Sequence, residues 1–247
     1  MKKLLQLSLF TFCTLLFINC SSDDDTTAQQ PGEQAVNPVI ETVTDIDGNV
    51  YNTVQLGNQL WMLENLKTTK FNDGTAISEW TFGDNWNQDN RTFPFYRWAD
   101  TSDLNNLHDE ELPEDFYGAV YNDAALNSGK LAPEGWRIPT EQDWIVLKSL
   151  ISADGQLGNE GTALKSTTGW AATSGVGTDL YGFNGLPNGY VTNFGTSTAV
   201  GVICTWATSD TNTTDLTRRV INILENTMEF DDNSWLLGAG VRCIKIQ

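Results

Sequence analysis

The stretch VTDIDGNVYNTVQL at residues 43–56 decides the fold class. Apolar and polar residues alternate on both sides of Asp47 and Gly48, and an Asp-Gly pair in this setting is the strongest short-range signal of a β-hairpin. A second turn leads into QLWM at residues 59–62, which has the composition of a further strand. We therefore expect the domain to open as a β-meander.

One helix is strongly indicated after Thr140. Thr140 can cap its first turn, and Asp143 lies three residues later, as in a capping box. Trp144 would lie on the inward face, and Gly155 would end the helix. A weaker pattern predicts a second helix over residues 116–126.

The rest of the chain has the composition of loops and strands. Residues 156–200 are rich in Gly, Ser, Thr and Asn, and strand-like segments follow at 202–207, 218–223, 227–231 and 240–246. The order predicts an α+β fold of mixed antiparallel sheets, with one or two helices and long ordered loops.

The N-terminus has the pattern of an export signal. Two lysines precede an uncharged apolar run at residues 4–18, too short for the ~20 residues that span a bilayer. Cys20 closes the run and SSDDD follows, which predicts a lipoprotein signal peptide over residues 1–19 and lipidation of Cys20. The alternative is an ordinary secretory signal or an uncleaved anchor, because Asn19 stands where a small residue is usual.

A polar stretch separates this signal from the folded part. Residues 20–40 have too few apolar side chains to offset the entropy of ordering, so we expect a disordered tether and then one domain over 41–247. The Ser and Asp run after Cys20 resembles the surface-export signal of Bacteroidota lipoproteins. The expected location is the outer membrane, with the protein lipid-anchored and exposed on the cell surface, and outer-membrane lipid is the expected partner of the anchor.

The net charge excludes one class of partner. The chain has 14 basic and 32 acidic residues, which gives a formal charge of 14 − 32 = −18. A protein that binds phosphates must bring basic residues to them. We therefore expect no nucleic-acid partner.

Only two cysteines, Cys204 and Cys243, lie in the expected domain. Export to an oxidising compartment favours a disulfide between them. The alternative is a pair of buried free thiols, since unpaired Cys is among the most buried residue types.

Four blocks of sequence together resemble one family. TVTDIDGNVY at 42–51 continues to WMLENLK at 61–67, GWRIPT stands at 135–140, YGFNGLPNGY at 181–190 and VRCIK at 241–245. With these blocks in this order, the chain resembles the Fibrobacter succinogenes major paralogous domain family over essentially all of its folded part.

The GWRIPT block adds an expectation about the fold. The segment from Gly135 to Glu141, with Trp144, is similar to one in formylglycine-generating-enzyme-like domains, which implies a C-type-lectin-like fold. In that fold the two chain ends pair in one sheet and long loops form the opposite side. Cys204 and Cys243 lack the close arrangement that the copper-dependent oxidation of those enzymes needs, so the activity is not carried over.

The residues that could carry out chemistry also have simpler structural explanations. His108, the single histidine, cannot build a zinc site or a triad alone, and Arg137 beside Trp136 suits packing and pairing with a carboxylate. We expect no cofactor. Calcium remains open at residues 45–49 and at 231–233, although the first segment fits a hairpin turn better than an EF-hand loop. A glycosidase carboxylate pair cannot be located, because its diagnostic is a separation in space.

The nine tryptophans point to recognition. Trp80, Trp86 and Trp98 lie in a loop-like stretch rich in Asn and Asp, where aromatic faces beside amides suit sugars or protein partners. The alternative is that these rings hold long loops in place. The sequence thus predicts a recognition or adhesion module for polysaccharide or a protein ligand, not an enzyme. A hydrolase or oxidase with an acidic site, and a structural surface protein, are the alternatives.

Overall fold

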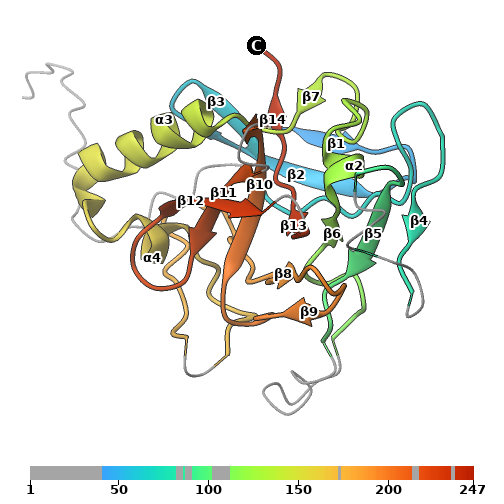
Figure 1. The fold of residues 1–247 in the computed structure, drawn as a ribbon. Coiled ribbons are helices and arrows are strands. Elements are labelled where there is room, and N and C mark those ends of the chain that lie inside the picture. Colours follow the sequence, from blue (N-terminus) through green and yellow to red (C-terminus); the bar gives the residue numbers. More distant parts are fainter. Residues whose placement is uncertain are drawn as a thin grey trace, which may run out of the picture. The chain divides into compact units, whose positions relative to one another are not determined.

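The computed structural model describes residues 41–81, 86, 91–101, 112–171, 174–212, 217–234 and 237–247. The expected signal peptide (1–19), the tether (20–40) with Cys20, and His108 lie outside the described residues. Most of the described elements are strands, and the helices are few, in agreement with the α+β class (Figure 1).

The first hairpin forms as its sequence predicts. Strands β1 (Thr42–Thr44) and β2 (Val50–Leu56) pair antiparallel, and β2 pairs in turn with β3 (Gln59–Met62). Gly48 takes the positive φ of 89° that the turn requires. The β-meander prediction is confirmed.

Both ends of the domain join one sheet. Its order is β1-β2-β3-β14-β7, in which β14 (Ile244–Lys245) lies between β3 and β7 (Trp136–Arg137). Ile244 is paired with Trp61 on one side and with Arg137 on the other. The last strand therefore closes on the first ones.

A larger sheet holds most of the remaining strands. Its seven strands run in the order β12-β11-β10-β13-β6-β5-β4. In chain order they are β4 (Ser78–Glu79), β5 (Phe95–Trp98), β6 (Ala119–Tyr121), β10 (Cys204–Asn212), β11 (Thr217–Ile223), β12 (Glu229–Ser234) and β13 (Ala239–Gly240). A small separate hairpin is formed by β8 (Tyr190–Val191) and β9 (Ser197–Thr198).

The strongly predicted helix is present as α3 (Glu141–Ile151). Thr140 and Asp143 form the capping box, and Trp144 is buried on the inward face. The chain continues as a π-helical turn, η2 (Ser152–Gln156), which ends as Gly155 takes a φ of 87°. A short helix that the sequence did not indicate, α4 (Glu160–Leu164), follows.

The second predicted helix, over 116–126, is wrong for most of its length. Gly118 has a φ of 78° and packs so closely on Asn65 that a side chain would not fit, which breaks any helix there. Strand β6 follows instead. Only α2 (Asp123–Leu126) is helical, capped by the Asn122 side chain.

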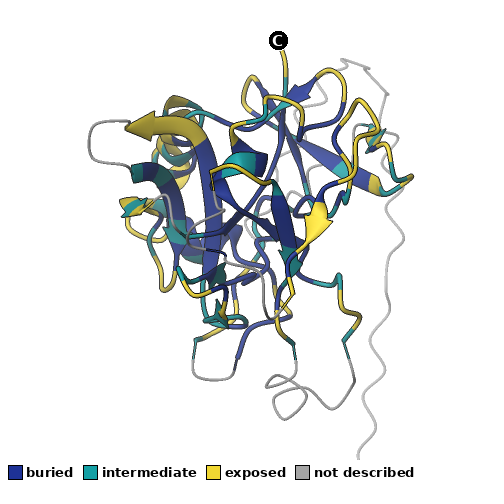
Figure 2. Ribbon diagram, turned by 45° about the vertical axis from the view of Figure 1, so that its right-hand side comes forward, coloured by how far each residue is buried: buried dark blue, intermediate teal, exposed yellow. Residues whose placement is uncertain are grey.

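One large apolar cluster lies where both sheets meet α3, and a second joins β2, β3 and β6. Trp61 from β3, Trp144 from α3 and Trp206 from β10 pack together. The Trp144 ring centroid lies 4.6 Å from that of Trp61 and 5.3 Å from that of Trp206. Figure 2 shows buried residues along the central strands and exposed ones in turns and at strand ends. The predicted inward position of Trp144 is confirmed, and Trp136 is buried as well.

A buried arginine sits where the chain crosses from the larger sheet to the smaller one. Arg242, between β13 and β14, is fully buried. It donates to the Asn65 Oδ1 and to backbone carbonyls of Leu63, Phe183 and Asn184 at 2.5–3.1 Å. Burial lowers its pKa to about 10, so the guanidinium stays charged at neutral pH. Three segments that are distant in sequence are therefore tied to one side chain.

The predicted disulfide is not formed. Cys204 and Cys243 are free, buried thiols that belong to different hydrophobic clusters. Trp206 and Gly240 face each other on parallel strands; Cys204 lies two residues before Trp206, and Cys243 lies three after Gly240. The two cysteines therefore lie in opposite directions along the strands from this pairing. That separation rules out a disulfide, which needs Cα atoms within about 7 Å.

The buried network makes a prediction about stability. Arg242→Met should lower the free energy of unfolding by about 3 kcal/mol or more, because it leaves several buried carbonyls without a donor. Arg219→Met is the control, since Arg219 makes partly exposed ion pairs with Glu141 and Asp232 that are worth about 1 kcal/mol at most. Chemical denaturation of both variants measures the difference. Equal losses would contradict a central role for Arg242.

Candidate functional site

A polar pocket opens beside the first hairpin and has a volume of about 380 Å³. Its walls come from the hairpin turn, the segment after β3, strand β5 and the segment that precedes β6. The lining residues are Asp47, Asn49, Lys67, Thr69, Trp98, Glu114 and Asp115.

Asp45 fixes the hairpin wall of this pocket. Its carboxylate accepts hydrogen bonds from the backbone N–H of Asp47 and Asn49, from the Asn49 amide, and from the Tyr51 hydroxyl at 2.6 Å. The turn is therefore shaped by protein donors. This geometry agrees with the expected hairpin role of residues 45–49.

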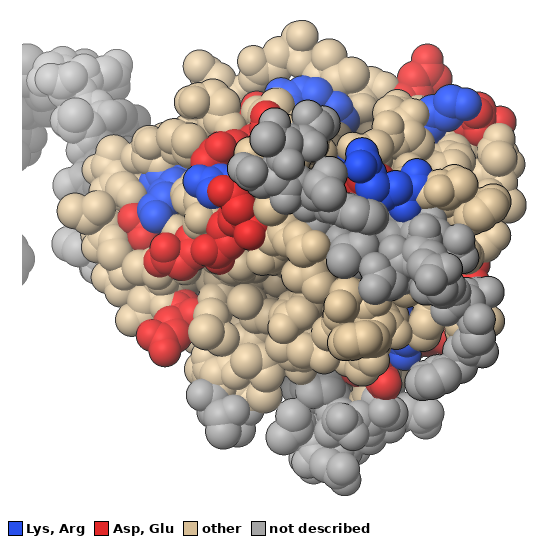
Figure 3. Space-filling model, in the orientation of Figure 1, with Lys and Arg blue, Asp and Glu red and all other residues tan. Residues whose placement is uncertain are grey.

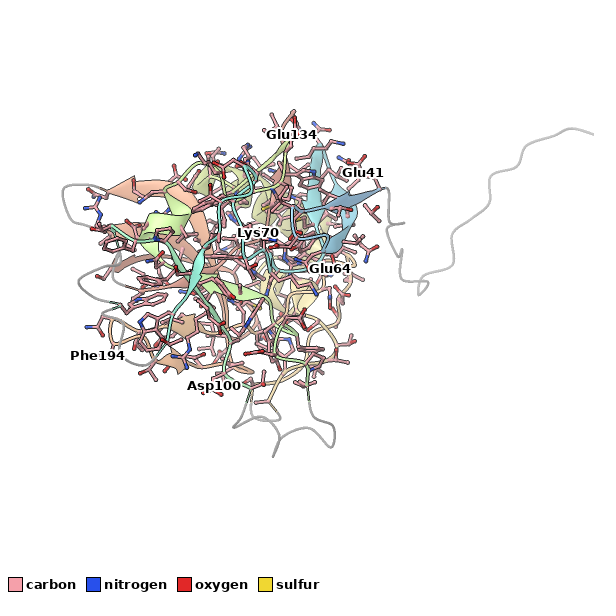
Figure 4. The ribbon with its side chains drawn as sticks, turned by 90° about the vertical axis from the view of Figure 1, so that its right-hand side faces the viewer. Glu41, Glu64, Lys70, Asp100, Glu134 and Phe194 are labelled. Carbon is pink, nitrogen blue, oxygen red and sulfur yellow. The ribbon has the colours of Figure 1, made fainter. Side chains whose placement is uncertain are left out.

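Asp47 reaches from the turn to the segment after β3. It accepts from the Thr69 backbone N–H at 2.6 Å and from the Thr68 and Thr69 hydroxyls at 3.1 Å. Lys70 pairs with its other oxygen at 2.7 Å. Burial acts to raise the pKa of Asp47, but these hydrogen bonds outweigh it and lower the pKa to about 2. Figure 4 views the side of the molecule where Lys70 is labelled.

The facing wall combines an ion pair with an aromatic ring. Lys67 pairs with Asp115 at 2.6 Å, and both side chains are partly exposed. Trp98, in β5, is half-buried and meets Tyr96 edge-on with ring centroids 5.3 Å apart. No described residue accepts a hydrogen bond from the Trp98 indole nitrogen.

This arrangement suits a ligand with many hydroxyl groups. Carboxylate, ammonium, amide and hydroxyl groups lie around one aromatic ring, which offers both charge-assisted hydrogen bonds and an apolar face. A general acid for glycoside cleavage needs a raised pKa, whereas that of Asp47 is low. Asp47 therefore fits an acceptor role.

The other two predicted tryptophans lie elsewhere. Trp80 and Trp86 are only 6% and 1% exposed, and their rings meet edge-on with centroids 6.1 Å apart. Gly195 packs against Trp80, and Gly238 packs against Trp86. These two rings hold loops together, which is the alternative that the sequence left open.

The acidic segment at 231–233 is engaged by protein side chains. It lies on the edge strand β12, where Asp231 accepts from Asn222 and Asp232 pairs with Arg219. Figure 3 shows carboxylates along this edge with Lys and Arg among them. Within the part of the chain that the structure describes, no three His, Cys, Asp or Glu side chains gather closely enough to hold a metal ion.

Arg137 has the structural role that the sequence favoured. It binds Asp143 through both guanidinium nitrogens at 2.6 and 2.8 Å, and Asp143 is the carboxylate of the α3 capping box. The guanidinium thereby holds β7 against the start of the helix.

Of the residues around the candidate pocket, the sequence points to Trp98 and the hairpin turn but not to the facing ion pair. Lys67 lies in the WMLENLK block at 61–67, but Asp115 is 48 positions away from it. No local pattern links two residues at such a distance. The signal available in the sequence is the set of four blocks that resemble the family.

The described part of the chain is thus a β-rich α+β domain whose first and last strands share one sheet, with a polar pocket beside its first hairpin. A family model described as the Fibrobacter succinogenes major domain matches residues 54–245, so the chain belongs to this family. Comparison with curated proteins and with solved structures gave no match. In the described ranges, no helix has the length and apolar character needed to cross a membrane.

The low pKa of Asp47 makes stability depend on pH. The ionised carboxylate contributes stability above the ordinary pKa of 3.8, and the contribution is lost as pH falls through about 2. Asp47→Asn should therefore lower the free energy of unfolding near neutral pH by about 2 kcal/mol and flatten its decline between about pH 4 and pH 2. Denaturation across that range, with Asp232→Asn as a surface control, measures both effects. An unchanged pH profile would disprove the assignment.

Proposed function

We propose that the protein is a lipid-anchored recognition module on the cell surface that binds polysaccharide through the pocket at Trp98. The observation that carries the proposal is the half-buried Trp98 ring beside the Lys67–Asp115 pair and the hairpin carboxylate Asp47. Sugar rings offer an apolar face and a rim of hydroxyls, and such a wall complements both.

The anchor rests on the N-terminal sequence. Residues 1–19 have the pattern of a lipoprotein signal, Cys20 is the residue for lipidation, and SSDDD favours export to the outer face of the outer membrane. Outer-membrane lipid is the partner of this anchor. The domain's acidity suits a soluble body held off a negatively charged surface.

We further infer a C-type-lectin-like arrangement. Pairing of the last strand, β14, with β3 brings the two ends of the domain into one sheet, as that fold requires. In Figure 1 the β8–β9 hairpin lies on the opposite side from this sheet. Both features support the fold without depending on its function.

The ionisation and pairing of the polar groups in the pocket favour binding over catalysis. In the pocket, Asp47 is held ionised and Asp115 is paired with Lys67, which suits hydrogen-bond acceptors better than a proton donor. The oxidase alternative would need accessible thiols, but Cys204 and Cys243 are buried, and burial raises the pKa of both.

Replacing Trp98 tests the proposal. On an array of plant and bacterial polysaccharides, Trp98→Ala should weaken binding at least about tenfold, because a stacked ring and its buried area are lost, whereas Trp98→Phe should keep most of it. Phe194→Ala is the control, since Phe194 is 78% exposed in the β8–β9 turn (Figure 4) and does not line the pocket. A bound polysaccharide that is insensitive to Trp98→Ala, or silence across the array, would refute the proposal.

A further inference from the structure

A second pocket, of about 260 Å³, lies at the end of β7 and shares no lining residue with the first. Its floor is made of buried apolar side chains, and its mouth is made of polar ones. The floor consists of Leu126, Leu131, Ala132, Trp136 and Ile138, and the mouth includes Arg137, Thr140 and Ser209. The block GWRIPT thus lines a cavity as well as starting α3.

The size of this pocket limits its ligand. An apolar cavity of about 150 Å³ in a protein core is enough to hold benzene. The present volume of about 260 Å³ therefore accommodates a single ring with small substituents, and a longer or polycyclic compound would extend into solvent. The Trp136 ring gives the floor an aromatic wall.

The mouth favours an uncharged ligand with a hydroxyl group. Arg137 is already neutralised by its two hydrogen bonds to Asp143, and the Thr140 hydroxyl donates to the same carboxylate. The planar guanidinium leaves a face on which an aromatic ring can lie. Because Asp143 already compensates the Arg137 charge, a charged group on the ligand would find no unpaired charge at the mouth.

Ser209 supplies the remaining polar group. The pairing of β10 with β11 is irregular between Ala207 and Thr211, and a bulge of this kind re-aims side chains. The Ser209 backbone N–H is fixed by the Pro139 carbonyl at 2.8 Å, while no described residue hydrogen-bonds its hydroxyl. A ligand hydroxyl can therefore pair with it.

We propose that this pocket binds a single uncharged phenolic ring, with the ring on the Trp136 floor and its hydroxyl at Ser209. The site is independent of the polysaccharide pocket, so either proposal can fail without the other.

Fluorine NMR of the full-length chain with para-fluorophenol tests the site. The fluorine signal should broaden with the wild type and with Ala153→Leu, an exposed control, but not with Ala132→Leu, which fills the floor. Ser209→Ala should weaken binding about fivefold, the effect of one lost hydrogen bond, and because its side chain is exposed it keeps the test valid if Ala132→Leu fails to fold. Phenol should displace the probe.

Four results would overturn the proposal. They are no broadening with the wild type, undiminished binding by a folded Ala132→Leu variant, undiminished binding by Ser209→Ala, and displacement by cyclohexanol as effective as that by phenol. Cyclohexanol has nearly the same size and the same hydroxyl but no aromatic ring, so the last result would remove the claim of aromatic recognition.

Discussion

The rest of the structure depends on the hydrogen bonds of the buried Arg242 guanidinium. It lies on the segment that carries the chain from β13 in the larger sheet to β14 in the smaller one, and the Leu66 and Met62 N–H groups bind the carbonyls on either side of it. Its donors are satisfied by Asn65 and by backbone carbonyls, and its charge lies over the Phe183 and Trp206 rings. Burying a charge without hydrogen-bond acceptors costs free energy, so the segments that supply these acceptors must pack around Arg242 together.

The same network positions the candidate site. Asn65 bonds Arg242, the Tyr117 carbonyl and the Trp206 indole, which fixes the chain just before Lys67. The Lys67 backbone N–H then donates to the Tyr51 hydroxyl, which in turn donates to Asp45 in the hairpin turn. A continuous set of hydrogen bonds therefore leads from the core to the pocket. The polar groups around Trp98 are held in place before any ligand arrives, which lowers the entropic cost of binding.

Features set by neighbouring residues could be predicted from the sequence, and features set by distant ones could not. The hairpin at Asp47-Gly48 and the capping box at Thr140 are local, and both form as expected. The helix over 116–126 failed because Gly118 packs on Asn65, a contact invisible to local patterns. The disulfide failed because strand register, not cysteine count, sets the separation of Cys204 and Cys243. Of the three candidate tryptophans, only burial in the fold separates Trp98 from the other two.

We propose Trp98, in the polar pocket, as the recognition residue. The most direct measurement is a nitrogen–proton correlation NMR spectrum of the tryptophan indoles, recorded as soluble plant and bacterial polysaccharides are added. The Trp98 signal should move while those of the buried Trp80 and Trp86 stay in place. A polysaccharide that shifts other indoles and leaves Trp98 unchanged would contradict it.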